Sequence, residues 1–150
     1  MAVTMDRAER EGFLAGAHVG IMSITESGRA PLCSPVWYAF EPGSGVWVIT
    51  HPSSRKGKLL AEGERYSLCA QNESPPAYQY VSVEGPLVET RKAELEKDYR
   101  PMSRRYLGAG LGDRFAEASW NVGFCVYVMR PERWLSGDYG KDELLGGATG

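Results

Sequence analysis

The first third of the chain contains three strand-like segments in succession, with no helix-like segment between them. The segment 18-HVGIMSITES-27 alternates apolar and polar residues, and 32-LCSPVWYAFE-41 and 46-VWVITH-51 are rich in β-branched and aromatic residues. A Ser-Gly pair and the run 42-PGSG-45 supply the turns. Parallel strands need long crossover connections, so this spacing disfavours a parallel doubly wound sheet and predicts an antiparallel meander.

The rest of the chain adds strands and a few helices to this start. Further strands are predicted at 66–72, at 78–90 with a bend at Gly85-Pro86, and at 122–136 with an exit at Pro131. Helices are predicted at 6–16 with Asp6 as the N-cap, 53–65, 92–110 with a break near Pro101, and 113–120. Six antiparallel strands with few crossover helices predict a mainly β fold, a small barrel with peripheral helices. We expect one domain over residues 1–150, with 142–150 as a flexible tail.

Charge and hydropathy narrow the classes of partner. The net charge is −2, from 17 basic and 19 acidic residues, which gives no general reason to expect a nucleic acid or an anionic membrane as partner. No apolar run approaches the roughly 20 residues of a membrane span. The N-terminus, MAVTMDRAEREGFL, is too charged for a secretory signal. A cytoplasmic protein is expected.

The cysteines support the same compartment. Cys33, Cys69 and Cys125 are odd in number, far apart in the sequence, and each lies among apolar neighbours. This pattern favours buried free thiols in a reducing cytoplasm over a disulfide framework or a zinc site. No cluster of metal-ligating residues is present in the sequence, so no metal is predicted.

The stretch 50-THPSSRKGKLL-60 places two cations where a helix is expected to begin. The helix dipole disfavours positive charge at that end. Ser53 or Ser54 would cap the helix and leave the following amides free, which is an arrangement that binds phosphate. Arg55 and Lys56 would then be the side-chain half of an anion site. The alternative, which the residues alone leave open, is a solvated helix start with two surface cations.

Other candidate residues favour packing over chemistry. His18 and His51 form no recognisable catalytic arrangement, and His51 is expected in a loop. The carboxylates of Glu94, Glu96 and Asp98 are interpreted as a solvated helix face. The run 107-LGAGLG-112 does not follow a strand and is not a dinucleotide-binding motif. Trp37, Tyr38 and Trp47 are interpreted as core or pocket wall. Trp134 is interpreted as an exposed aromatic at an interface.

One resemblance connects these features. The stretch 31-PLCSPVWYAFEPGSGVWVITHPSSRKGKLLAEGERYSLCAQN-72, followed by 80-YVSVEGPLVE-89, resembles the pyridoxamine 5′-phosphate oxidase-like family of flavin-binding split barrels. That superfamily also contains the deazaflavin-dependent reductases of actinobacteria. The resemblance covers about half the chain. It implies a six-stranded antiparallel split β-barrel that forms a homodimer, with the cofactor in a groove between two subunits.

The resemblance also implies roles for individual residues. Thr50, Ser54, Arg55 and Lys56 fall where the oxidases hold the FMN phosphate. The strand that lies against the flavin ring corresponds to Ser34, Pro35, Val36 and Trp37, and Tyr80 falls near a further cofactor contact. The residues expected to line the substrate pocket are Tyr38 and Trp134.

Departures from the family pattern limit the reaction that is implied. The oxidases have Arg and Lys where this chain has Ser34 and Ala39, and their C-terminal arginine-histidine motif is absent. A true pyridoxine phosphate oxidase is therefore not expected. The resemblance implies a flavin-type oxidoreductase that binds FMN and acts on a small organic substrate. Two alternatives stay open: a reductase that uses the deazaflavin F420, and a flavin- or haem-binding storage protein without turnover.

Overall fold

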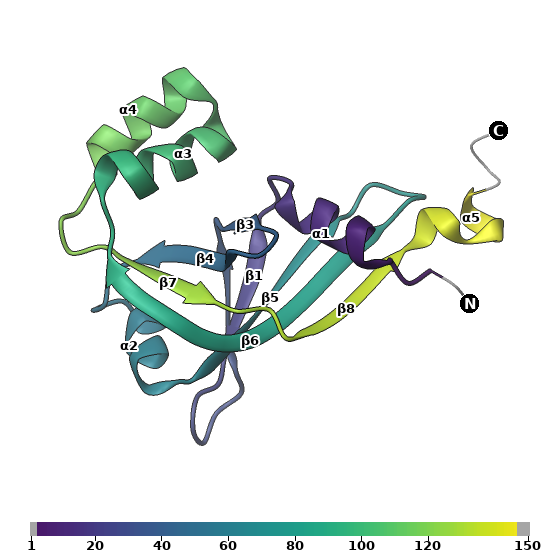
Figure 1. Cartoon of the computed structure of the whole chain (residues 1–150), viewed down its shortest axis with the longest axis horizontal. Helices are drawn as coiled ribbons and strands as arrows, with labels where there is room; N and C mark the ends of the chain where they lie inside the picture. The colour runs from purple at the N-terminus through teal and green to yellow at the C-terminus, as the bar shows by residue number, and fades with distance from the viewer. Residues whose placement is uncertain (1–2, 147–150) are drawn as a thin grey trace.

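In the computed structural model, which describes residues 3–146, the first four strands form two hairpins at opposite edges of one sheet (Figure 1). Strand β1 (Gly20–Ile24) pairs with β2 (Leu32–Val36), and β3 (Ala39–Glu41) pairs with β4 (Gly45–Thr50). The strand order is β2-β1-β5-β6-β7-β4-β3. The predicted middle strand thus pairs with both of its neighbours, but it does so with different halves of its length.

This connectivity forces the sheet to curl. Only Trp37 and Tyr38 separate β2 from β3, and three steps of a trans chain span at most about 11 Å. The two outermost strands of the sheet must therefore lie close together, which bends the sheet into a half-barrel. Tyr38 holds the link in place, because its buried hydroxyl donates a hydrogen bond of 2.7 Å to the carbonyl of Leu14.

The long strand β6 (Gln79–Lys92) belongs to both halves of the curled sheet. Its first half pairs with β5 (Arg65–Asn72) and with β8 (Arg133–Asp138). Its second half pairs with β7 (Cys125–Met129). All six predicted strand segments are present, but 32–41 and 122–136 each divide into two, so the sheet has eight strands.

A register shift in β6 between Leu87 and Glu89 confirms the bend predicted near Gly85-Pro86. The reason for glycine is a close crossing of two backbones. A Cβ at Gly85 would clash with the carbonyl oxygen of Arg130, in the connection between β7 and β8. Only a residue without a side chain lets that connection pass.

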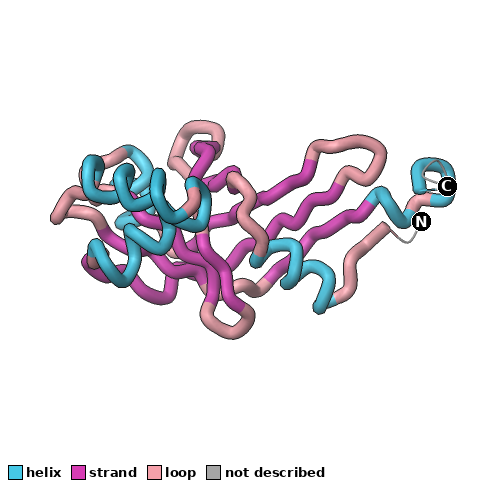
Figure 2. The backbone as a smooth tube through the Cα atoms, turned by 90° about the horizontal axis from the view of Figure 1, so that it is seen from above, coloured by secondary structure: helices cyan, strands magenta, loops and turns pink. Residues whose placement is uncertain are grey.

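The helices lie along the margins and ends of the sheet (Figure 2). Asp6 caps α1 and forms a capping box with Glu9, as the sequence predicted for an N-cap. Gly112 allows the two helices that follow β6 to pack closely, because a Cβ there would lie 2.7 Å from the Cα of Arg104. The helical segments are α1 (Arg7–Ala15), α2 (Arg55–Glu62), the π-helical η1 (Leu95–Tyr99), α3 (Arg100–Leu107), α4 (Ala109–Ser119), the 3₁₀ segment η2 (Tyr139–Lys141) and α5 (Glu143–Gly146).

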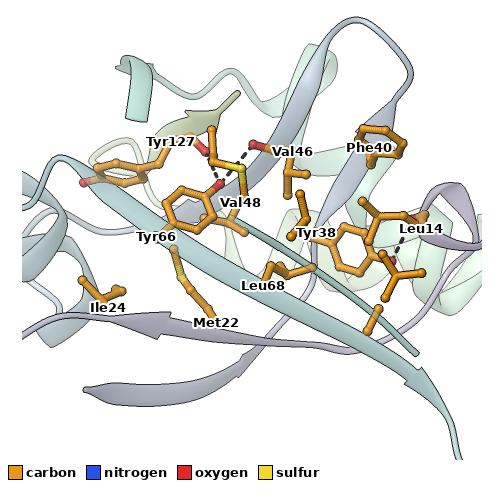
Figure 3. Close-up of a cluster of buried hydrophobic side chains, with 14 of the residues drawn as sticks. Leu14, Met22, Ile24, Tyr38, Phe40, Val46, Val48, Tyr66, Leu68 and Tyr127 are labelled. Atoms are coloured by element: carbon orange, nitrogen blue, oxygen red, sulfur yellow. Dashed lines mark hydrogen bonds between the residues drawn. The ribbon is translucent and has the colours of Figure 1, made fainter. Parts of the chain in front are cut away.

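The core fills the inside of the half-barrel (Figure 3). Alternate residues of β1, β5 and β6 point into it and are almost fully buried. Tyr66 lies at its centre, with its hydroxyl 3.0 Å from the carbonyl oxygen of Val46 and 3.2 Å from that of Tyr127. Burial raises the pKa of Tyr66 well above its usual range. Its hydroxyl therefore stays protonated and ties β5 to the β4–β7 ladder.

The expected burial of the three thiols is wrong. Cys33 is exposed, and Cys69 and Cys125 are half-buried. Cys33 and Cys69 occupy outward positions of β2 and β5, whereas the residues on either side of Cys69 fill the core. Apolar neighbours along a strand therefore did not indicate which face each cysteine occupies.

The interpretation of Asp98 as part of a solvated helix face is also wrong. Asp98 is 2% exposed and accepts two hydrogen bonds of 2.8 Å from Arg91 and one of 2.8 Å from the Glu94 amide. Burial acts to raise its pKa, but these hydrogen bonds outweigh burial, so the pKa lies below its usual value. The carboxylate fixes the start of η1 against β6.

The tail predicted at 142–150 lies partly in α5, and its residues 147–150 lie outside the described residues. No helix within residues 3–146 has both the length and the apolar composition of a membrane span. The same part of the chain holds no group of three His, Cys, Asp or Glu side chains placed to bind a metal ion.

Candidate functional site

A groove of about 370 Å³ lies where β2 and β4 meet the start of α2 and the α3–α4 hairpin. Five of the nine residues predicted to contact the cofactor line it together: Pro35, Val36, Trp37, Thr50 and Lys56. The remaining lining residues are apolar or aromatic: Val19, Ile49, Tyr99, Met102, Phe115 and Phe124. The groove is thus an apolar slot with a polar end at α2.

The polar end is built by the turn from β4 into α2. Ser54 is the N-cap: its hydroxyl accepts a hydrogen bond of 3.0 Å from the Gly57 amide and donates one of 2.7 Å to the His51 carbonyl. Thr50 therefore donates its proton to Ser54, at 2.9 Å. A Cβ at Gly57 would clash with the His51 carbonyl oxygen, so glycine allows this tight start.

Two donors are left free at this helix start. The amides of Arg55 and Lys56 have no hydrogen-bond acceptor among residues 3–146. First-turn amides lack an intrahelical partner, and the helix dipole adds a partial positive charge there. The turn after β4 therefore presents two free amide donors beside the Ser54 cap, as the sequence predicted for this helix start.

The two cations of the predicted pair have different surroundings. Arg55 is exposed and forms a 2.6 Å ion pair with Glu26, in the turn after β1. Lys56 is half-buried and lines the groove, where its ammonium lies 3.5 Å from the Ser34 hydroxyl. Lys56 is thus the only cationic side chain that lines the groove in the described part of the chain.

Trp37 forms one wall of the groove and is held by a stack of aromatic rings. It stacks on Tyr106, with ring centroids 5.0 Å apart and planes 4° apart, and contacts Phe115 at 5.3 Å. The Tyr106 hydroxyl accepts a hydrogen bond of 3.0 Å from the Tyr38 amide and donates one of 2.7 Å to the His18 carbonyl. Burial raises the pKa of Tyr106, which keeps this donor protonated.

Arg105 lies beside Tyr106 on α3 and fastens this helix to the rest of the chain. Its guanidinium donates hydrogen bonds to the carbonyls of Tyr38, Ala15 and Gly16, at 3.1, 2.9 and 2.7 Å. The α3–α4 hairpin that forms the far wall of the groove is therefore anchored at its α3 end, and the slot has a fixed width there.

The hydroxyl groups near the groove are committed to internal hydrogen bonds. Ser119 donates to the Phe115 carbonyl at 2.6 Å, so Tyr99 donates its proton to Ser119 at 2.7 Å. Thr50 donates to Ser54. Among the described lining residues, the Lys56 ammonium and the Trp37 indole N–H keep side-chain protons free for a ligand, and the groove offers no histidine or carboxylate as an acid or a base.

The other predicted site residues lie outside this groove. Ser34 and Ser54 lie next to it, because their hydroxyls contact the lining residues Lys56 and Thr50, respectively. Tyr80 lies on β6 opposite Gly137 of β8.

The two residues expected in the substrate pocket also lie elsewhere. Tyr38 is fully buried in the core and offers no exposed surface. Trp134 is not the exposed aromatic that was expected, because Phe40 and the guanidinium of Arg10 cover it.

The sequence reasoning missed the wall contributed by the α3–α4 hairpin. Tyr99, Met102 and Phe115 line the groove from these helices, and Phe124 follows them. Tyr99, Met102 and Tyr106 recur at helical spacing, so an apolar stripe on a segment at the sheet rim was the available signal. Nothing in a single sequence indicates that this stripe faces Trp37.

Comparisons with known proteins agree with this fold. A family model described as pyridoxamine 5′-phosphate oxidase matches residues 7–136. A search of curated proteins found no match. Among solved structures, a conserved hypothetical protein from Mycobacterium tuberculosis is similar with a TM-score of 0.75 and 21% identity, over 93% of this chain and 89% of that one.

Two further structures share the fold at lower identity. A protein described as an F420 reductase has a TM-score of 0.67 and 15% identity, over 83% of this chain and 94% of its own. The haem storage protein HutZ from Vibrio cholerae has a TM-score of 0.61 and 15% identity, over 88% and 94% of the two chains.

Proposed function

Because this chain belongs to the pyridoxamine 5′-phosphate oxidase family, we propose that it is a flavin-dependent oxidoreductase that holds FMN in the groove beside α2. The substrate proposed is a small organic molecule. One observation carries the proposal: five of the nine residues that the family resemblance assigns to the cofactor line a single slot, with a cation and free amides at one end.

The donors at that end fit a phosphate group. Two free amides, the Lys56 ammonium and the open side of the Arg55 guanidinium are all hydrogen-bond donors, and the anion would offset the cost of two cations at a helix start. The Thr50 hydroxyl donates its hydrogen bond to Ser54, so Thr50 helps to position the cap but offers no donor to the ligand. A phosphate dianion is the ligand that this set of groups suits best.

The apolar part of the slot fits a flat ring. Pro35 and Val36 present the edge strand β2, and Trp37 and Phe115 form the facing wall. FMN would supply the hydride or electron chemistry. The protein would orient the ring, exclude water and hold the phosphate, which agrees with the lack of a free acid or base among the lining residues.

We also propose that the protein acts as a homodimer. The groove continues onto the outer face of the sheet through Val19 and Pro35, both exposed. Ile21 lies between Pro35 and Cys69 on that face. A second copy laid on this face would cover apolar side chains and close the groove.

A reductase that uses F420 is the second candidate. The pairing of Arg55 with Glu26 favours it, because it leaves Lys56 as the one groove cation in the described part of the chain. A slot with one cation and many apolar residues also suits a deazaflavin ring. The similar fold of an F420 reductase supports the same candidate at the level of fold.

A storage or sensing protein is the candidate from a different class. It is favoured by the committed hydroxyls of the groove, since a binding protein needs no proton donor. The fold that the chain shares with a haem storage protein supports this class.

Identification of the bound cofactor tests the proposal directly. The purified protein is expected to be yellow and to release FMN on denaturation, as read by absorbance and mass spectrometry. A colourless protein that shifts the absorbance of added F420 would favour the second candidate, and a Soret band after haem addition would favour the third. NAD(P)H or reduced deazaflavin consumption with a panel of acceptors separates turnover from storage.

A double variant, Arg55→Ala with Lys56→Ala, tests the phosphate site. It is expected to lower FMN affinity about 20-fold or more, because the charge-assisted hydrogen bond of Lys56 contributes about 1.5–3 kcal/mol and Arg55, paired with Glu26, adds less. Lys58→Ala is the matched control, since Lys58 is an exposed cation on the same helix. Unchanged affinity in a folded double variant would rule out this groove end as the phosphate site.

A further inference from the structure

A second cavity, of about 430 Å³, lies where α1 meets the β3–β4 hairpin and the β7–β8 connection. It shares no lining residue with the cofactor groove. Gly45, at the start of β4, lines this cavity, and Thr50, at the end of β4, lines the groove. Five residues of extended chain place the two sites about 16 Å apart.

Three arginines line this cavity, and their charges are unequally compensated. Arg7 forms a 3.1 Å ion pair with Glu11, which also lines the cavity. Arg130 forms a 3.2 Å ion pair with Glu132, and both side chains are largely exposed. Arg10 has no carboxylate partner within residues 3–146. The lining therefore carries a net positive charge, with three cations against Glu11.

Arg10 is the least satisfied of the three. Its guanidinium lies over the ring of Trp134, 4.7 Å from the centroid. Its Nε is buried and has no hydrogen-bond acceptor in the described part of the chain. A buried donor without an acceptor is unfavourable, because its lost hydration is not replaced. The stack on Trp134 orients the guanidinium but supplies no counter-charge.

The rest of the lining is suited to an apolar body. Val88 and Pro131 form an apolar surface beside the arginines. Val88 is 49% exposed. The hairpin contributes the backbone of Gly43 and Gly45 and the hydroxyl of Ser44. A ligand that joins an anionic group to a small apolar body would satisfy both parts of the cavity.

We propose that this cavity is a second binding site, for a small organic carboxylate or phosphate ester. The anionic group pairs with Arg10 and Arg130, and the apolar body covers Val88 and Pro131. The site does not depend on the flavin groove, because the two share no residue. Its ligand therefore binds whether or not a cofactor is present.

The test uses the full-length protein and two pairs of probes in a calorimetric and NMR titration. Benzoate and phenyl phosphate are the anionic probes, and benzamide and phenol are their neutral counterparts. The anions are expected to bind with Kd values between about 10 µM and 1 mM, and the neutral molecules at least tenfold more weakly. The indole signal of Trp134, assigned with Trp134→Phe, is expected to shift only with the anions.

Arg10→Gln is expected to weaken anion binding at least tenfold, because it removes the cation and keeps a side chain of similar length. Arg29→Gln is the matched control, as an exposed arginine whose one ion pair is a 3.9 Å contact with Glu26. If Arg10→Gln does not fold, as judged by circular dichroism, Arg130→Gln takes its place.

Two results would overturn the proposal. One is the absence of binding by either anion up to about 10 mM, which corresponds to less than about 3 kcal/mol of binding free energy. The other is equal binding by the wild type and the folded arginine variant, which would locate the anion elsewhere. Cofactor loading is measured separately, so a failed flavin assignment leaves this test unaffected.

Discussion

At the scale of single residues, Arg55 and Lys56 show how far a motif determines a role. The resemblance assigns both to a phosphate, and both begin α2. Their surroundings separate them, because Arg55 is paired with Glu26 and Lys56 faces the groove. An exposed ion pair contributes little to stability, but it lowers the charge that Arg55 offers to a ligand.

Single substitutions should therefore have unequal effects. Lys56→Gln is expected to lower flavin affinity about tenfold or more, and Arg55→Gln only about two- to threefold. The quenching of flavin fluorescence on titration with apoprotein measures both. Lys58→Gln, on the exposed side of the same helix, should leave affinity unchanged. Equal losses in the two variants would mean that Arg55 leaves Glu26 to bind the ligand.

The candidate site could be predicted from the sequence only where local chemistry determines it. The Ser54 cap, the free amides and the strand β2 follow from residue type and order. The ion pair of Arg55 with Glu26 joins residues 29 positions apart, and no local pattern encodes it. Tyr38 was misplaced for a related reason: its ring points into the core, and the chain turns at that residue between two edges of the sheet.

At the scale of elements, the α3–α4 hairpin depends on one glycine. A Cβ at Gly112 would lie 2.7 Å from the Cα and 2.8 Å from the N of Arg104, which are backbone atoms that cannot move alone. A Cβ at Gly110, in the same helix, would meet only the guanidinium of Arg114 at 3.8 Å. Of the three glycines in 107-LGAGLG-112, Gly112 is thus needed for packing, Gly110 is not, and Gly108 provides the positive φ of 81° before α4.

Alanine at these two positions should act in opposite directions. Gly112→Ala is expected to destabilise the protein by about 1–3 kcal/mol through overpacking. Gly110→Ala is expected to stabilise it by up to about 1 kcal/mol, since alanine loses less backbone entropy in a helix. Urea unfolding of both variants measures the difference. Destabilisation of the same size at both positions would show that the helix pair does not require close approach at Gly112.

The element boundaries follow the same division between local and distant causes. The helix starts at Asp6 and Ser54 were predicted because caps are local. The division of 32–41 and 122–136 into two strands each was not, because it arises where the chain changes partner strand. The start of α4 at Ala109 was missed because glycine in a sequence usually indicates a helix break. In this helix, Gly112 instead permits close packing against α3.

At the scale of the whole molecule, the curled sheet has one face filled by the core and one that faces outward. The outward side chains of β1, β2 and β8 include Ile21, Pro35 and Leu135, and Leu135 is 64% exposed. Exposed apolar side chains on one face of a sheet are typical of a surface that another protein covers. Since Pro35 also lines the groove, dimer formation and cofactor binding are coupled in the proposed arrangement.

A charge placed on this face should separate the subunits. Ile21→Asp is expected to convert a dimer of about twice the 16.5 kDa chain mass into a monomer, because a carboxylate would be buried without a partner at the interface. Sedimentation velocity measures the mass, and a flavin titration of the same sample is expected to show weaker binding. Leu144→Asp, at an 87% exposed position on α5, is the control that should remain dimeric. A monomeric wild type would refute the dimer, and a folded Ile21→Asp dimer would move the interface to another face.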